Sequence, residues 1–570
     1  MPPRLGRTTA LVAALFAVVT GCEPAPTADV ILRGGTVYDG SGEAPIVGDV
    51  AIRGDSVVAV GDLGDWAADA EIDVTGKAVA PGFINMLSWA TETLLEDPRG
   101  LSDLMQGVTL EVFGEGGSMG PVNDAMKREM VESQGDIRFD VEWTTLGEYL
   151  EHLESRGVSP NVASFVGATT VRIHELGYED RAPTPDELAR MQELVREAMR
   201  EGALGVGSSL IYAPAFYADT EELVALMQAA SEFGGMYISH MRSEGNRLVE
   251  AVDELIRIAR ESDAPAEIYH LKAAGEANWP KLDEVIERVE TARSQGLRIT
   301  ADMYTYTAGA TGLDAAMPPW VQEGGYEAWA ARLRDPAVRR RVIQEMRTPT
   351  DEWENLMLLA GDPSRVVLVG FKADSLKPLT GMSLAQVAED RGMTPEETAI
   401  DLVIKDGSRV GTVYFLMSED NVRRQIQLPW IAFDSDAGAP APEGVFLRSN
   451  PHPRAYGNFA RLLGRYVREE GLIPMEEAIH KLTGFPAENL GIRRRGRLAP
   501  GYHADVVVFD PDRIIDRATF EEPHQLAEGM EQVFVNGVQV IRDGAHTGAT
   551  PGRVVRGPGW TGWEPARGGN

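Results

Sequence analysis

The stretch MYISHMRSEGNRLVEAVDELIRIARESDAPAEIYHLK, residues 236–272, indicates the fold of the chain. It begins and ends with short apolar runs, MYISH and AEIYH, that are typical of buried strands. The segment between them, GNRLVEAVDELIRIARESD, carries apolar residues at helical spacing. A strand, a helix and a second strand in this order predict a βαβ unit with parallel strands.

The same alternation continues on both sides of this unit. Helical patterns such as TPDELARMQELVREAMREG separate β-rich runs, and eight such runs can be read: GFINML, VTLEVFGE, VASFVGA, ALGVGSS, MYISHM, AEIYHLK, RITADMY and WIAFDSD. Eight is the strand number of a TIM-type (β/α)8 barrel, so we predict this α/β fold. The reactive groups of such barrels lie at the C-terminal ends of the strands.

One segment interrupts the alternation before the last predicted strand. Residues from about 313 to 362 are rich in Trp, Pro and charged residues, which predicts a lid-like insertion in a barrel spanning 81–489. The run VVLVGF at 366–371 follows, and it is an alternative candidate for a barrel strand.

Both ends of the chain have a residue pattern that differs from the βα alternation of the middle. Residues 29–80 and 490–555 contain short apolar and polar alternations between turn signals, such as DVILRGGTVYDG and EQVFVNGVQVIRDG. We expect the two ends to pair into one small β-sandwich beside the barrel, followed by a C-terminal tail at 556–570.

Composition and charge restrict the class of partner. The 570 residues are 43% hydrophobic and 25% charged, which is a globular composition. Because 87 Asp and Glu outnumber 54 Lys and Arg, the formal charge is −33. Such a chain would repel a phosphate backbone, so we expect a small-molecule partner and no nucleic acid.

The N-terminus predicts export. Arg4 and Arg7 precede the apolar run ALVAALFAVVTG, which is typical of a signal peptide over residues 1–21. The sequence VTGC resembles a bacterial lipobox, in which Cys22 would be lipidated and residues 22–28 would form a tether. We therefore expect a lipoprotein of the bacterial cell envelope, facing the periplasm or the exterior and held to the membrane only by its lipid. A cleaved signal with an incidental cysteine is the alternative.

Two of the nine histidines point to a metal site. His240 and His270 end successive predicted strands, so their imidazoles should project from the same rim of the barrel. Hydrolytic zinc sites use three protein ligands and leave one position open for water. Glu115 closes the second predicted strand between glycines and is our candidate for the third ligand. A solvated loop glutamate is the alternative.

A second carboxylate is placed to act as a base. Asp436 ends the last predicted strand, and strand alternation puts Asp434 and Asp436 on one face. A carboxylate beside an activated water can take its proton and return it to a leaving nitrogen. His452 and His174 lie in predicted loops, and we expect structural roles for them.

The residues resemble a known family. The motifs that carry the resemblance are ADVILRGGTVYDGSG, APGFI, QGVT, EGALGVGSSLIYAP, SHMRSEG, HLKAAG, ADMYTYTAG, SDAG, HPRAYG, KLTGFPAENLGIRRRGRLAPGYHADVVVFDP and VFVNG. With these motifs, the chain resembles the D-aminoacylases, or N-acyl-D-amino-acid deacylases, of the amidohydrolase superfamily from about residue 29 to 555.

This resemblance implies zinc-dependent hydrolysis of the amide bond of N-acyl-D-amino acids, with Asp436 as the general base. His240 and His270 match the family's tightly held metal ligands. Lys272 and Tyr304 match positions that bind the α-carboxylate of the substrate. Tyr212 and Arg454 lie in matching motifs and are further candidates for substrate contact.

The chain departs from the family pattern in three places. The family's first strand ends in His-x-His, where this chain has Leu87 and Trp89, so we expect one zinc per chain and Trp89 as part of an apolar wall. The family's ligand cysteine falls on Gly116, one residue after Glu115. The family's GHGT reads GATT, which puts Ala168 at the place of a histidine.

Two other functions compete with a single-metal deacylase. A barrel that has lost catalysis could survive as a ligand-binding lipoprotein, and the missing family histidines favour this view. A cyclic-amide hydrolase of the dihydroorotase or hydantoinase type usually keeps His-x-His and a lysine at the end of the fourth strand. The corresponding ALGVGSS has no lysine, so this alternative ranks last.

Overall fold

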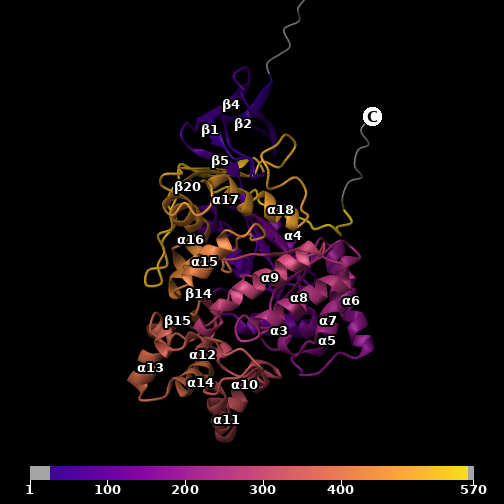
Figure 1. Cartoon of the computed structure of the whole chain (residues 1–570), viewed down its shortest axis with the longest axis vertical. Helices are drawn as coiled ribbons and strands as arrows, with labels where there is room; N and C mark the ends of the chain where they lie inside the picture. Colours follow the sequence, from indigo (N-terminus) through magenta and orange to yellow (C-terminus); the bar gives the residue numbers. More distant parts are fainter. Residues whose placement is uncertain (1–25, 563–570) are drawn as a thin grey trace, which may run out of the picture.

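The computed structural model describes residues 26–562 (Figure 1). The predicted signal peptide, Cys22 and most of the predicted tether lie outside these residues. Among the described residues, no helix has the length and apolar character needed to span a membrane.

Short parallel strands form the centre of the molecule. Seven of the eight predicted runs contain them: β6 (Phe83–Asn85), β7 (Val108–Phe113), β8 (Asn161–Ser164) with β9 (Val166–Gly167), β10 (Gly205–Ser209), β11 (Met236–His240), β12 (Ala266–Ile268) and β13 (Ile299–Ala301). They are ordered β6-β7-β8 and β9-β10-β11-β12-β13. All of these pairs are parallel, as the βαβ pattern predicts.

The eighth predicted run links the last strand to the first. Ile431 forms a parallel bridge with Ala301 of β13, and Ala437 forms one with Ser88 just after β6. The strands therefore follow one another in the order of a (β/α)8 barrel, which confirms the predicted fold class.

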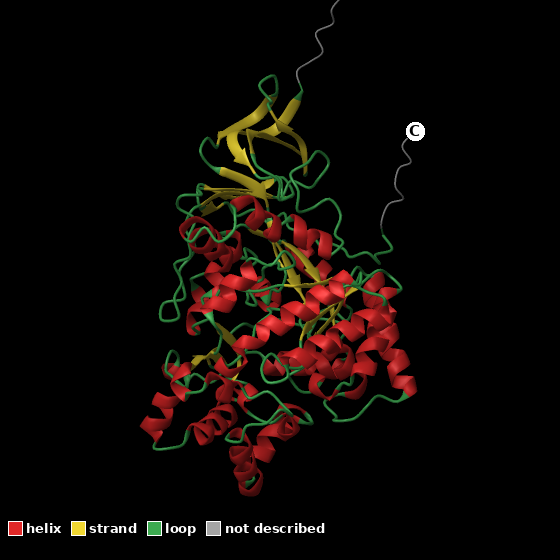
Figure 2. Ribbon diagram, viewed as in Figure 1, coloured by secondary structure: helices red, strands yellow, loops and turns green. Residues whose placement is uncertain are grey.

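Helices cover the outside of these strands (Figure 2). They are α1 (Ala90–Glu96), α2 (Leu101–Leu104), α3 (Asp124–Ser133), α4 (Leu146–Arg156), α5 (Ala168–Leu176), α6 (Pro185–Arg200), α7 (Thr220–Ser231), α8 (Leu248–Ser262) and α9 (Leu282–Ser294). In the longer helices buried residues recur at helical spacing, as Leu248, Val252, Leu255 and Ala259 do in α8. Helix α6 begins at a capping box between Thr184 and Glu187.

The insertion is larger than predicted. Strands β14 (Ala308–Gly312), β15 (Val366–Gly370) and β16 (Gly411–Phe415) form an antiparallel sheet, joined by α10 (Gly325–Arg334), α11 (Pro336–Met346), α12 (Leu356–Ala360), α13 (Leu384–Arg391) and α14 (Pro395–Asp406). One apolar cluster runs through this unit from Leu313 to Leu416, well beyond the predicted limit at residue 362. VVLVGF is therefore β15 of the insertion, and its assignment to the barrel is wrong because it pairs with β16.

Both chain ends enter one sheet, at the top of Figure 1. It contains β1 (Thr27–Val37), β2 (Ile46–Arg53), β3 (Ser56–Gly61), β4 (Ala67–Asp73), β5 (Ala78–Pro81), β17 (Val506–Phe509), β18 (Met530–Val535), β19 (Val538–Arg542) and β20 (Ala545–His546). The two ends meet where β17 runs antiparallel to β5. The chain then returns to the barrel, since Val554 bridges Val162 of β8.

Four further helices follow the last barrel segment or just precede it. They are α15 (Glu419–Ile426), α16 (Arg454–Arg461), α17 (Met475–Leu482) and α18 (Gly484–Asn489). Helix α16 matters for the site because its first residue is Arg454.

Candidate metal centre and active site

The three predicted metal ligands converge at the C-terminal ends of the strands. Oε1 of Glu115 lies 3.0 Å from Nδ1 of His240 and 3.0 Å from Nε2 of His270. The two imidazole nitrogens are also 3.0 Å apart. All three side chains are buried, with exposed fractions of 5%, 5% and 2% for Glu115, His240 and His270.

Glycines allow Glu115 to reach this position. Gly114 and Gly116 have φ angles of 112° and 67°, values that favour glycine. A Cβ atom on Gly116 would lie only 2.1 Å from Oγ of Ser209. The tight glycine turn therefore brings the carboxylate inward from the end of β7.

The three atoms fit a zinc ion. Ligands at about 2.0–2.1 Å around a tetrahedral zinc are about 3.3 Å apart, close to the separations observed. Hydrogen bonds alone do not satisfy the group, because two imidazole N–H groups directed at Glu115 would face each other across 3.0 Å. Although burial opposes its ionisation, contacts with His240 and His270 lower the pKa of Glu115 to about 2.

Glu244 completes the surroundings of the histidines and was not predicted. Its Oε1 accepts a hydrogen bond from Nζ of Lys272 at 2.7 Å and lies 3.0 Å from Nδ1 of His270. A carboxylate on the second nitrogen of a ligating histidine fixes its tautomer and orientation. The only signal in the sequence was the position of Glu244, four residues after His240 in SHMRSEG.

The insertion reaches this site through Glu354. Its Oε2 accepts hydrogen bonds from Oγ of Ser243 (2.7 Å), the backbone N–H of Glu244 (2.8 Å) and that of Gly245 (2.9 Å). The turn that carries Glu244 is therefore tied to the insertion. A cavity of about 630 Å³ lies next to this turn, lined in part by Ser243, Glu354 and Leu359.

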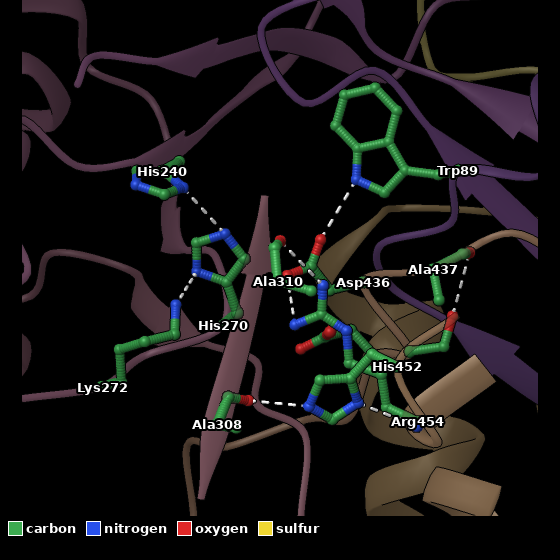
Figure 3. A network of polar contacts seen from close by, with 12 residues as sticks. Trp89, His240, His270, Lys272, Ala308, Ala310, Asp436, Ala437, His452 and Arg454 are labelled. Atoms are coloured by element: carbon green, nitrogen blue, oxygen red, sulfur yellow. Dashed lines mark hydrogen bonds and ion pairs between the residues drawn. The ribbon is translucent and has the colours of Figure 1, made fainter. Parts of the chain in front are cut away.

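Asp436 is held by a hydrogen bond and an ion pair from different elements (Figure 3). Nε1 of Trp89 donates to Oδ1 at 3.1 Å, and Nη1 of Arg454 lies 2.8 Å from Oδ2. Asp436 has a φ of 43° and His270 a φ of 35°, left-handed conformations that are uncommon for such residues and recur at functional sites. Burial raises the pKa of Asp436, while the charge of Arg454 opposes this shift.

The predicted substrate-binding residues lie around the same centre. The guanidinium of Arg454 is 4.4 Å from the ring centroid of Tyr304, and Nζ of Lys272 is 5.4 Å from it. The buried hydroxyl of Tyr304 has no hydrogen-bond partner among the described residues. Tyr212 packs on His240 with ring centroids 5.3 Å apart.

His452 lies just before α16, whereas His174 lies on α5. His452 accepts the backbone N–H of Arg454 on Nδ1, and its Nε2 donates to the carbonyl of Ala308. Burial lowers the pKa of His452 well below its usual value, so it stays neutral and fixes the start of α16. His174 lies on α5, where its Nδ1 is 3.0 Å from Glu175.

The first strand differs from expectation. Leu87 is fully buried, but Trp89 is 43% exposed and lies at the N-terminus of α1, beyond the end of β6. The expectation that Trp89 forms part of an apolar wall is therefore wrong, and its indole acts as a hydrogen-bond donor.

Asn85 is buried and donates to Asp103 and Ser435. Ala168, the first residue of α5, is 6% exposed.

Comparisons with a family model and with known proteins point to the same family. A model described as "Amidohydrolase family" matches residues 70–541. D-aminoacylase from Alcaligenes xylosoxydans xylosoxydans is 34% identical over 531 residues, which cover 92% of this chain and 97% of that protein.

Solved structures agree with this result. A crystal structure of D-aminoacylase superimposes with a TM-score of 0.77 at 34% identity, covering 93% of this chain and 99% of that one. N-acyl-D-glutamate deacylase from Bordetella bronchiseptica, solved with zinc and a phosphonate inhibitor, gives a TM-score of 0.76 at 29% identity, covering 93% and 100%. The chain belongs to the amidohydrolase family, among the D-aminoacylases and N-acyl-D-amino-acid deacylases.

Proposed function

We propose that the protein hydrolyses the amide bond of N-acyl-D-amino acids, or of small peptides that contain D-residues, with zinc as its cofactor. The observation that carries this proposal is the convergence of Glu115, His240 and His270 within 3.0 Å of one another, on the rim that also holds Asp436. The relatives named D-aminoacylase, N-acyl-D-aspartate deacylase and N-acyl-D-glutamate deacylase support the reaction class.

Each side chain has a chemical role in this proposal. Glu115, His240 and His270 hold the zinc, which when bound lowers the pKa of a water and polarises the amide carbonyl. Asp436 takes a proton from the attacking water on Oδ1 or Oδ2 and gives it to the leaving nitrogen. Its burial, which raises its pKa, favours this exchange at moderate pH.

The substrate is held by donors around Asp436. Lys272 and the unpartnered hydroxyl of Tyr304 bind the α-carboxylate, since a cation and a phenol both suit that group. Arg454 and Tyr212 are further contacts for the substrate. Glu244 and Glu354 act behind the metal ligands and position them.

We propose one zinc per chain. Only one group of three ligating side chains lies close enough together among the described residues. Near Asp436, the guanidinium of Arg454 at 2.8 Å disfavours a second cation. A study of D-aminoacylase reports one-metal activation and second-metal attenuation in that protein, which is compatible with a site that uses one metal.

The two alternatives have less support. A decayed, binding-only barrel has no reason to keep a buried ligand set, a base with a raised pKa and carboxylate-binding candidates together. A cyclic-amide hydrolase usually keeps a lysine at the end of the fourth strand, and β10 reads GVGSS.

We also propose export as a lipoprotein of the bacterial cell envelope, anchored through Cys22. The proposal rests on the signal-like residues 1–21 and the following VTGC. Metabolic labelling with a radioactive fatty acid tests it. Wild type should be labelled and Cys22→Ser should not, whereas label in both proteins would contradict the anchor.

A substrate panel tests the reaction. Purified zinc-loaded protein should hydrolyse N-acetyl derivatives of some D-amino acids and leave the L-enantiomers largely intact. Absence of turnover on all D- and L-derivatives, with zinc bound, would contradict the deacylase and favour the binding protein.

A further inference from the structure

We propose that Trp89 is a positioning residue for Asp436, and that its indole N–H keeps the carboxylate in the orientation required of the base. This inference rests on the proposed function. The contact that carries it is the hydrogen bond from Nε1 of Trp89 to Oδ1 of Asp436 at 3.1 Å (Figure 3).

Backbone pairing fixes the two residues side by side. The N–H of Asp436 donates to the carbonyl of Leu87 at 3.0 Å, and the N–H of Trp89 donates to that of Ala437 at 2.9 Å. Ser88 and Ala437 form the parallel bridge between these segments. The register of the first and last barrel segments therefore places the indole next to the carboxylate.

The exposure of Trp89 is also explained by this contact. It is 43% exposed, one of few large apolar side chains so exposed among the described residues. A tryptophan at a rim can present its ring to solvent while its N–H bonds to a buried acceptor. The acceptor here is the proposed base, whose side chain is only 11% exposed and whose backbone is in a left-handed conformation with a φ of 43°.

The two partners of Asp436 have different consequences. His452 fixes the backbone of Arg454, and the guanidinium lies over the Tyr304 ring and forms an ion pair with Oδ2 of Asp436, so it defines one side of the carboxylate. With Arg454 as the only partner, the carboxylate could rotate and offer both oxygens to the guanidinium as a bidentate pair. The indole N–H opposes this rotation, because it holds Oδ1 away from Arg454. A lone pair on Oδ1 then stays available for the proton.

Two variants separate the N–H from the ring. Trp89→Phe removes the donor and keeps an aromatic ring, whereas Trp89→Leu removes both. We expect kcat of each variant to fall about tenfold with KM nearly unchanged, which is the size expected for one hydrogen bond to a charged group. Zinc content and the midpoint of thermal unfolding should stay at the wild-type values, because Trp89 contacts none of the three ligands and is partly exposed.

A matched control variant and a double-mutant cycle with Asp436→Asn complete the experiment. Trp320→Phe removes a similar indole bond, from Nε1 to Glu345 at 2.7 Å, in the insertion, and should leave kcat unchanged. In a background of Asp436→Asn, Trp89→Phe should have no further effect on the residual rate. Wild-type kcat in Trp89→Phe with a loss only in Trp89→Leu would assign the effect to the ring and overturn the inference. Absence of activity in wild type would instead contradict the proposed function.

Discussion

Oε1 of Glu115 lies 3.0 Å from Nε2 of His270, although 155 residues separate them in the sequence. One residue ends the second strand of the barrel and the other ends the sixth. Their contact brings a carboxylate to a histidine whose other nitrogen faces Glu244. This arrangement supplies three ligands for the proposed one-zinc site without the family's first-strand histidines.

Glu244→Gln should weaken zinc binding while leaving the fold intact. The change removes the negative charge that Nδ1 of His270 and Nζ of Lys272 share. Loss of such a partner typically costs about 10–100-fold in metal affinity. Competition with a chromophoric chelator measures the effect. Glu250→Gln, an exposed position on α8, is the control and should bind zinc as wild type does.

Glu354→Ala should loosen the turn that carries Glu244. The substitution leaves the N–H of Glu244 without its acceptor and leaves the N–H of Gly245 with only Oγ of Ser243 at 3.1 Å. An unsatisfied N–H that stays buried costs roughly 1–3 kcal/mol. Hydrogen exchange should become faster in residues 243–247. Unchanged exchange there would show that the insertion does not hold the turn.

Asp436→Asn should separate binding from turnover. The amide keeps the size of the side chain but cannot take a proton from water, so we expect zinc to remain bound and kcat to fall by about two to four orders of magnitude, the range for a general base. Zinc content and the initial rate, measured on the same preparation, test this. Loss of zinc in this variant would mean that Asp436 is itself a metal ligand.

Glu267 should make stability depend on pH. It lies inside the barrel near Asp302 and Asp434, and burial raises its pKa to about 7. The folded state therefore holds a proton that the unfolded state loses near pH 4.5, so the free energy of unfolding should fall as pH rises from about 4.5 to 7.

Glu267→Gln should flatten this profile, because an amide can still accept from Thr300 and Asn489 but does not titrate. Between pH 4.5 and 7, the free energy of unfolding of wild type should fall by on the order of 3 kcal/mol more than that of Glu267→Gln. Urea unfolding at several pH values measures it, with the exposed Glu290→Gln as the control. A variant with the slope of wild type would assign the pH dependence to other groups.

The sequence predicted the barrel because its strands are short apolar runs that alternate with helical patterns, and several of them carry a polar residue at or near their end. His240 and His270 could be paired from this pattern, since one βα unit separates them. The first strand of the insertion could not be predicted in the same way, because AGATG, residues 308–312, has no apolar alternation and becomes a strand only through pairing with β16.

Contacts between loops far apart in the chain could not be predicted from the sequence either. Glu244 and Glu354 are ordinary loop glutamates in a chain with 87 acidic residues, and their roles depend on how the insertion folds back. Trp89 was expected to be part of an apolar wall because it stands where the family has a ligand histidine. It lies instead at the N-terminus of α1, is 43% exposed and bonds to Asp436.

The zinc content of wild type and Glu115→Gln tests the central claim most directly. After dialysis against a weak chelator, wild type should retain about one zinc per chain, because three buried ligands hold it. Glu115→Gln should retain little zinc and lose activity in parallel, while its thermal unfolding in the absence of metal matches that of wild type. A Glu115→Gln protein that keeps a full equivalent of zinc and wild-type turnover would contradict the account.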